Sequence, residues 1–284
     1  MRISKLFEIT ALKLCFLIGN IIFHKPYETK TKRARFKKFF KGNNFIEVPL
    51  TDNYTEMDKN GFHILKNNQA DKNIKNHKQI INICNKITSY KINFLKNDKS
   101  YLKTIDMTKI NNDTLKKIYK YITQEYFINI ANKYLKSKPH LVELKILISP
   151  VLNKKEKLSG SQEWHSDYDD ERNLKLFIYL DNVSNENGPL QLINKNTSQI
   201  IFNKKNYKWG NKNSHCDTLV EKQYDNEIIK LTGSKGDIVF VDTVSCLHRG
   251  SRKVQKERKI LYASFNTRSS FRNPPFHKFL SLIK

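Results

Sequence analysis

The segment from Gln162 to Asp167 (Gln-Glu-Trp-His-Ser-Asp) holds the sharpest chemical signal in the chain. In an extended strand, residues two positions apart point to the same face, so the His165 imidazole and the Asp167 carboxylate would converge. One neutral nitrogen and one anionic oxygen are two of the three ligands in the facial triad that holds non-haem Fe(II). Alone, the His-x-Asp pattern is weak, because such side chains more often bind each other or water.

A third ligand must come from a distant strand, and the candidate is His248. It follows a turn and an apolar strand that begin at Gly236. Further along, Arg258 opens the next strand-like run. A planar guanidinium binds a carboxylate through two parallel hydrogen bonds, so a buried arginine near a metal suits a dicarboxylate cosubstrate. The 2-oxo acid end of that cosubstrate would chelate the metal.

The apolar spacing indicates helices first and strands afterwards. Residues 67–89 have helical spacing, and a clearer helix starts near Asp113, with its apolar stripe continuing to Tyr134. After Pro139 the pattern changes, and turns such as Asn187-Gly188-Pro189 separate short strand-like runs. These runs cover residues 141–148, 174–180, 190–193, 228–231, 237–241 and 259–265. Short strands without helix-length spacers favour an antiparallel sandwich or barrel.

Two blocks of the sequence resemble the phytanoyl-CoA dioxygenase family of Fe(II)/2-oxoglutarate-dependent oxygenases. The first runs from Trp164-His165-Ser166-Asp167 through residues 176–183 to the turn at 186–190, and the second runs from residues 236–237 through 248–250 to Arg258. Motif order and strand context make this resemblance more specific than His-x-Asp alone, and it spans residues 60–265. It implies a mixed, mainly β fold: a double-stranded β-helix (jelly-roll) core with flanking N-terminal α-helices.

The resemblance also implies the site and its chemistry. Iron would be held by His165, Asp167 and His248, and Arg258 would anchor 2-oxoglutarate. Enzymes of this kind use O₂ while decarboxylating 2-oxoglutarate to succinate and CO₂, and they hydroxylate an unactivated C–H bond of a small organic substrate. Asp167 favours hydroxylation, because halogenating relatives lack this carboxylate. Further candidates for contact with the cosubstrate are Thr243 and Gln162.

The chain departs from the family pattern in two places. Residues 193–198 replace the family's usual Pro-Gly-Ser-His turn, which leaves the local loop geometry open. The spacing from His248 to Arg258 is one residue shorter than the commonest arrangement, so Lys259 is a fallback anchor. Arg258 is preferred, because a planar fork matches a carboxylate better than an ammonium does.

The chain has 284 residues and a formal net charge of +25, which invites a nucleic-acid interpretation. However, lysine far outnumbers arginine, and the excess runs through the whole chain with Asn and Ile, as AT-rich codon usage would produce. We therefore expect no nucleic-acid partner, although the charge could steer an anionic substrate. Four cysteines without a C-x-x-C pair, and no apolar run near 20 residues, predict a cytoplasmic protein.

Residues 1–45 are predicted to form a basic amphipathic segment, and residues 46–284 a single oxygenase domain. Within that domain the helical part covers residues 66–138 and the jelly-roll core residues 140–268. The basic segment could contact a membrane surface peripherally, but an ordinary helix packed on the domain is favoured. The alternative function is a catalytically idle β-sandwich module that binds nucleic acid or anionic membrane through this segment. A module of that kind would have no need for the four candidate site residues, which are His165, Asp167, His248 and Arg258.

Overall fold

The computed structural model describes residues 52–89, 94–95, 99–151, 160–167, 170, 172–207, 216–250 and 254–267. The basic segment predicted at residues 1–45 lies outside the described residues. None of the helices in the described part of the chain is long and apolar enough to cross a bilayer.

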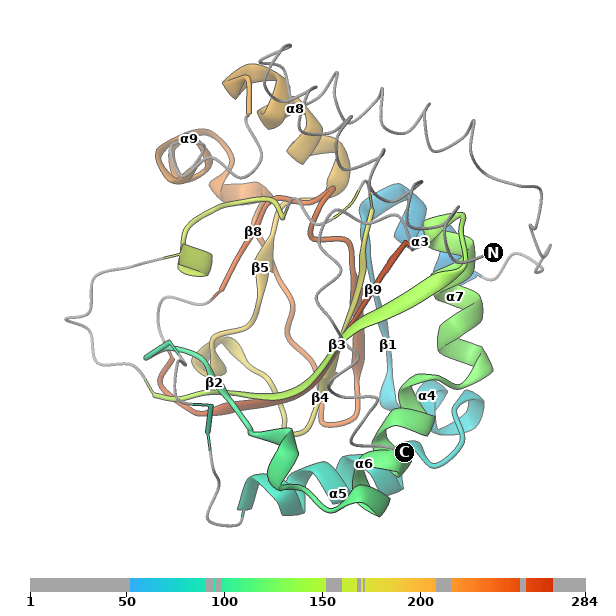
Figure 1. Ribbon diagram of the computed structural model, residues 1–284. Helices are drawn as coiled ribbons and strands as arrows, with labels where there is room; N and C mark the ends of the chain where they lie inside the picture. Colours follow the sequence, from blue (N-terminus) through green and yellow to red (C-terminus); the bar gives the residue numbers. More distant parts are fainter. Residues whose placement is uncertain are drawn as a thin grey trace, which may run out of the picture.

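The strands form two antiparallel sheets that pack against each other (Figure 1). The larger sheet has the order β1-β7-β4-β9-β3-β2, with β1 Phe62–Leu65, β7 Ile238–Val241, β4 Leu174–Tyr179, β9 Arg258–Thr267, β3 Pro139–Ser149 and β2 Lys103–Thr104. The smaller sheet has the order β6-β5-β8, with β6 Ile229–Lys230, β5 Gln191–Leu192 and β8 His248–Arg249. This arrangement confirms the predicted mainly antiparallel jelly-roll fold with flanking helices, and the described strands do not close into a barrel.

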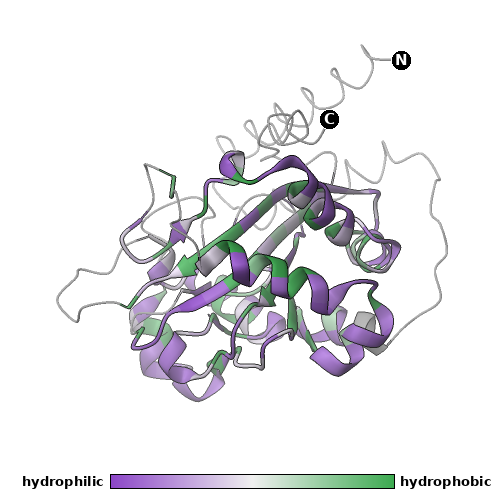
Figure 2. Ribbon diagram, turned by 90° about the horizontal axis from the view of Figure 1, so that it is seen from below, coloured by the Kyte–Doolittle hydropathy of each residue, from purple (hydrophilic) through white to green (hydrophobic). Residues whose placement is uncertain are grey.

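Helices cover the outer face of the larger sheet. Those that contribute to its core are α3 Asp52–Asn60, α4 Asn67–Asn73, α5 His77–Ser89, α6 Asn112–Ile122 and α7 Glu125–Leu135. Two more helices, α8 Lys195–Lys205 and α9 Asp217–Gln223, pack around Trp164 at the other side of the molecule. Figure 2 shows hydrophobic residues along the strands and hydrophilic residues on the exposed turns of the helices. The apolar stripes therefore meet the sheet, as their spacing predicts.

Each helix predicted from apolar spacing is divided into two. The stripe up to Tyr134 is shared by α6 and α7, because the chain leaves the helical conformation at Thr123 and Gln124. The predicted helix at residues 67–89 breaks between α4 and α5, where Asn76 has a φ of 61°. Asparagine tolerates this left-handed conformation better than most residues. The apolar spacing indicates which face of a helix is buried, but it does not indicate where the helix is interrupted.

The segment that replaces the family's turn forms the beginning of a helix. The Asn194 side chain accepts a hydrogen bond from the backbone N–H of Thr197 at 2.9 Å, and it thereby caps the N-terminus of α8. Asparagine is among the best residues at this position, because its side-chain oxygen satisfies a free N–H of the first turn. The local geometry that the sequence left open is therefore a capped helix.

Candidate metal centre

His165 and His248 are joined through their backbones. The His165 N–H donates to the His248 carbonyl at 3.0 Å, and the His248 N–H donates to the His165 carbonyl at 2.9 Å. His165 lies in an isolated bridge rather than in the extended strand expected from the sequence. The pairing still brings the imidazoles together, with ring centroids 4.2 Å apart. A segment before β4 and the short strand β8 thus supply the two candidate nitrogen ligands.

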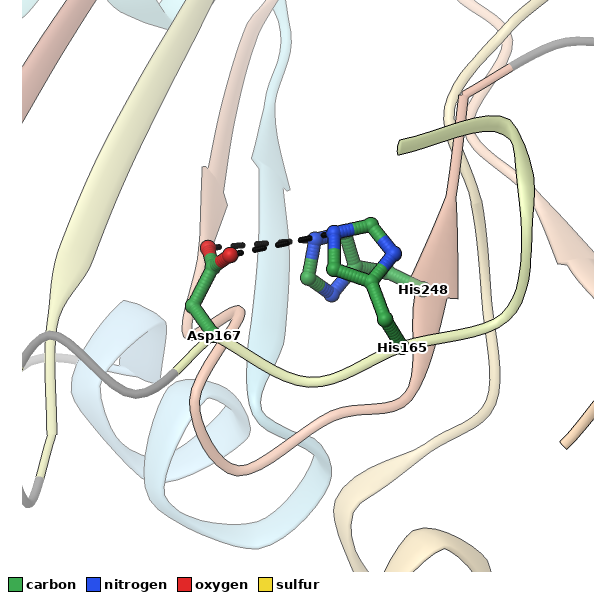
Figure 3. Close-up of side chains that lie close together, drawn as sticks. All are labelled: His165, Asp167 and His248. Atoms are coloured by element: carbon green, nitrogen blue, oxygen red, sulfur yellow. Dashed lines mark ion pairs between the residues drawn. The ribbon is translucent and has the colours of Figure 1, made fainter. Parts of the chain in front are cut away.

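Asp167 completes a compact cluster with these two histidines (Figure 3). Its Oδ1 lies 3.8 Å from His165 Nε2, and its Oδ2 lies 3.8 Å from His248 Nε2. The ligand atoms of the three residues all lie within 4.8 Å of one another. Two imidazoles and one carboxylate that converge in this way can hold a divalent metal on one face of its coordination shell.

Backbone carbonyls orient both imidazoles. His165 Nδ1 lies 2.8 Å from the Glu163 carbonyl oxygen, and His248 Nδ1 lies 3.2 Å from that of Cys246. A carbonyl can only accept, so each Nδ1 carries a proton, and in the neutral ring each Nε2 keeps its lone pair. The lone pairs therefore face Asp167, and second hydrogen bonds of this kind fix the ligands of metal sites. The donor set fits a metal ion.

Two donors hold one oxygen of the Asp167 carboxylate. The Thr243 hydroxyl donates to Oδ2 at 2.5 Å, and the Lys175 ammonium contacts the same oxygen. The Asp167 N–H also donates to the Thr243 carbonyl at 3.0 Å, and the Asn173 amide donates to the Thr243 hydroxyl at 3.0 Å. The predicted residue Thr243 therefore contacts a candidate metal ligand directly.

The electrostatic environment favours the protonation states that metal binding requires. Burial would raise the pKa of Asp167, but the Lys175 ammonium and then the two imidazoles hold that pKa far below its ordinary value. Burial, together with the neighbouring His165, lowers the pKa of His248 to about 3. At neutral pH the site therefore presents an anionic carboxylate and a neutral imidazole, and metal ligands must be deprotonated in this way.

Asp242 shapes the turn that carries Thr243 and leads to His248. Its Oδ1 accepts the N–H groups of Val244 at 2.9 Å and Ser245 at 3.0 Å, and it is completely buried. Its Oδ2 accepts the Tyr134 hydroxyl of α7 at 2.7 Å. We did not predict a role for Asp242 from the sequence, although an Asp that starts an Asp-Thr-Val-Ser run is typical of a turn closed by its own side chain.

Arg258 and Lys259 point to opposite sides of β9. Arg258 is 8% exposed, and its Nη2 donates to the Ser149 hydroxyl at 3.0 Å, while its Nε has no hydrogen-bond partner among the described residues. Lys259 pairs instead with Glu257 at 3.2 Å and Asp181 at 3.7 Å. A buried guanidinium with an unused donor fits a carboxylate ligand, because buried polar groups are normally satisfied. Lys259, the fallback anchor, lies on the opposite side of β9 from the Arg258 guanidinium.

Two residues beside the cluster are buried and remote from solvent. Gln162, the other predicted cosubstrate contact, is 5% exposed in a short 3-10 helix, Gly160–Gln162. Trp164 is completely buried, and the Arg249 guanidinium lies 4.6 Å from its ring centroid. Arg249 also donates to Glu221 of α9 at 2.8 Å. Through Trp164 and Arg249, α9 therefore packs against the residues next to both histidines.

No family model matches the chain, and no curated protein matches it in sequence. Solved structures do match. The apoform of EctD from S. alaskensis is 12% identical with a TM-score of 0.51, over 80% of this chain and 80% of that one. HygX from Streptomyces hygroscopicus, solved with nickel, 2-oxoglutarate and hygromycin B, is 11% identical with a TM-score of 0.52, over 77% and 88%. EctD with 2-oxoglutarate and 5-hydroxyectoine is 12% identical with a TM-score of 0.51, over 80% and 79%. The chain thus has the jelly-roll fold of proteins that bind a metal and 2-oxoglutarate.

Proposed function

We propose that the protein is an Fe(II)- and 2-oxoglutarate-dependent oxygenase. The observation that carries this proposal is the convergence of His165, Asp167 and His248, whose ligand atoms lie within 4.8 Å of one another. Two histidines and one carboxylate are the facial triad of non-haem iron oxygenases, and three coordination positions remain for cosubstrate and oxygen. Bound iron would supply the activation of O₂ that is coupled to decarboxylation of 2-oxoglutarate.

The other residues would orient the ligands and the cosubstrate. Thr243 and Lys175 hold Oδ2 of Asp167, so Oδ1 is the oxygen available for the metal. Arg258 would bind the distal carboxylate of 2-oxoglutarate through its buried guanidinium, with the Ser149 hydroxyl beside it. In this proposal Thr243 acts through Asp167, and Gln162 remains a candidate for contact with the cosubstrate.

Hydroxylation of a small organic molecule is the reaction that we propose. The carboxylate of Asp167 supports hydroxylation, because it occupies the position that halogenating relatives leave to a halide. The structural neighbours were solved with small molecules, hygromycin B in one case and 5-hydroxyectoine in another. We also propose that the chain belongs to the phytanoyl-CoA dioxygenase family, and the support for this is the two blocks of sequence that end at Leu190 and Arg258.

Anaerobic titration of the Fe(II)-loaded protein with 2-oxoglutarate tests this function. We expect a visible metal-to-ligand charge-transfer band that saturates, because the 2-oxo acid end chelates iron directly. His165→Ala should bind iron poorly and give no band. A Glu186→Gln variant, which removes an exposed ion pair with Lys256 at 2.6 Å, is the control and should behave as the unmodified protein. Iron binding without a band would contradict the cosubstrate, and failure to bind iron would contradict the metal centre.

A further inference from the structure

Besides Arg258, three charged residues of the larger sheet share the face that is turned toward Asp167. Lys175 of β4 and Glu143 of β3 both pair with Ser264, which lies between them on β9. Directly paired residues lie on one face of a sheet, and Lys145 joins them because it is two positions beyond Glu143. The contact of Lys175 with the Asp167 carboxylate identifies this face as the one toward the metal centre.

These charges form a connected network with Tyr262. Lys145 Nζ donates to Glu143 Oε1 at 2.6 Å, and the Tyr262 hydroxyl donates to Glu143 Oε2 at 3.0 Å. Burial would raise the pKa of Glu143, but Lys145 and then Lys175 lower it below its ordinary value, so the carboxylate is anionic. We refer to these four side chains, Lys175, Glu143, Lys145 and Tyr262, as the charged wall.

The charged wall contrasts with the apolar residues that follow it on the same face, before Arg258 at the far end. Farther from the metal centre, Leu147, Val239 and Ile260 form an apolar core with the smaller sheet. Charged groups in such a core are costly to desolvate, and apolar residues would stabilise the fold as well or better. Side-chain exposure rises from 13% at Lys175 to 38% at Lys145. The wall therefore leads from the metal centre toward solvent, where a ligand would approach.

We propose that the charged wall binds the primary substrate, and that this substrate is a small zwitterion of the amino-acid class. The inference rests on the proposed function, and it differs from the purely anionic substrate that the net charge suggests. A ligand with only anionic groups would meet Glu143, and one with only cationic groups would meet two lysines and the metal. A zwitterion can place its carboxylate near Lys175 or Lys145 and its ammonium near Glu143. An apolar ligand would desolvate these groups without offering them any charged or polar partner in return.

Binding of amino acids to the Co(II)-loaded protein with 2-oxoglutarate tests the inference without turnover. Each of the twenty standard amino acids is titrated while the visible d–d absorption of Co(II) is followed. We expect at least one to change the spectrum saturably. The corresponding amine without the carboxylate, and the acid without the amine, should each bind at least tenfold more weakly, because each loses one of the two charges.

Glu143→Gln separates the charge of the wall from its shape. We expect amino-acid binding to weaken at least tenfold, while the affinities for Co(II) and 2-oxoglutarate stay unchanged. Glu186→Gln is the matched control and should change none of the three affinities. The inference is overturned if no amino acid alters the spectrum, if a singly charged or uncharged analogue binds as tightly, or if Glu143→Gln has no effect. Failure of the unmodified protein to bind Co(II) or 2-oxoglutarate would overturn the proposed function and the inference together.

Discussion

The two faces of β4 differ in what they do. On the outer face, Leu174, Leu176 and Ile178 are completely buried against the helices. On the inner face, Lys175 contacts a candidate metal ligand, and the residues that follow it two and four positions later are aromatic. Side chains alternate along a strand, so one strand can serve the core and the site at the same time. Along β4, residues that pack in the core therefore alternate with residues that face the candidate site.

The same division holds across the larger sheet. Its outer face is apolar throughout the described core and is covered by helices. Its inner face is turned toward the short strands of the smaller sheet, where His248 lies. This face carries the charged wall near the candidate metal centre, apolar residues farther away, and Arg258 at the far end. Substitutions on the two faces should consequently affect different measurements.

Leu176→Ala should have the largest effect of the changes considered, and only on stability. The side chain is completely buried between the sheet and the helices, so its removal leaves a cavity. We expect the free energy of unfolding to fall by about 2–5 kcal/mol in urea titrations. The Co(II) affinity of the folded protein should not change. A loss of metal affinity with little loss of stability would contradict the separation of the two faces.

Arg258→Gln should lower the affinity for 2-oxoglutarate and leave the fold intact. Hydrogen bonds to charged groups are worth about 1.5–3 kcal/mol, so a loss of roughly 30-fold is expected in the charge-transfer titration. Lys259→Gln is the control, because its side chain pairs with carboxylates on the other side of β9. If Lys259→Gln weakens binding and Arg258→Gln does not, the anchor is the fallback residue.

Thr243→Val tests the support of the metal ligand. The substitution keeps the shape but removes the hydroxyl that donates to Asp167 at 2.5 Å. Residues that orient metal ligands typically contribute 10–100-fold to metal affinity, and we expect about tenfold, because Lys175 still contacts the same oxygen. Competition with a chelator measures the change. Thr243→Ser should restore the affinity, and an equal loss in both variants would point to packing instead.

His77 gives the smallest effect, through the pH dependence of stability. Its Nε2 lies 2.8 Å from the Gly236 carbonyl oxygen and its Nδ1 lies 2.5 Å from the Tyr121 hydroxyl, so a neutral ring that donates from Nε2 and accepts at Nδ1 satisfies both contacts. Burial lowers its pKa below the ordinary 6.5. As the pH falls, the His77 ring therefore becomes protonated in the unfolded chain before it does so in the folded protein. The free energy of unfolding that His77 contributes is fully present above pH 6.5 and decreases as the pH falls below 6.5.

The measurement is urea unfolding of the metal-free protein at about pH 7 and pH 5.5. The lower pH is one unit below the ordinary pKa of histidine, so we expect His77 to account for at most about 1.4 kcal/mol of the loss between these conditions. His248 contributes in the same direction, so the comparison is with His77→Gln, in which the loss should be smaller. An unchanged pH dependence in that variant would show that the His77 pKa is not lowered.

Local patterns predicted much of the fold. The alternation after Pro139 predicted strands that the structure places at β3, β4, β7 and β9, and β5 and β6 are shorter than expected. The same approach missed the breaks near Asn76 and Thr123, because backbone conformation at a few residues does not change the apolar spacing. It also missed Lys175, because a lysine in a strand is usually exposed to solvent.

The sequence by itself determined the set of candidate ligands and their order along the chain. His165 and Asp167 are neighbours, so any extended backbone brings them near each other, and the motif blocks single out His248. Only the tertiary structure decided which donors surround them. Strand pairing sets Lys175 and Glu143 on one face, and the turn held by Asp242 brings Thr243 to the carboxylate. These contacts join residues far apart in the chain, and their register depends on how the sheets pack rather than on local spacing.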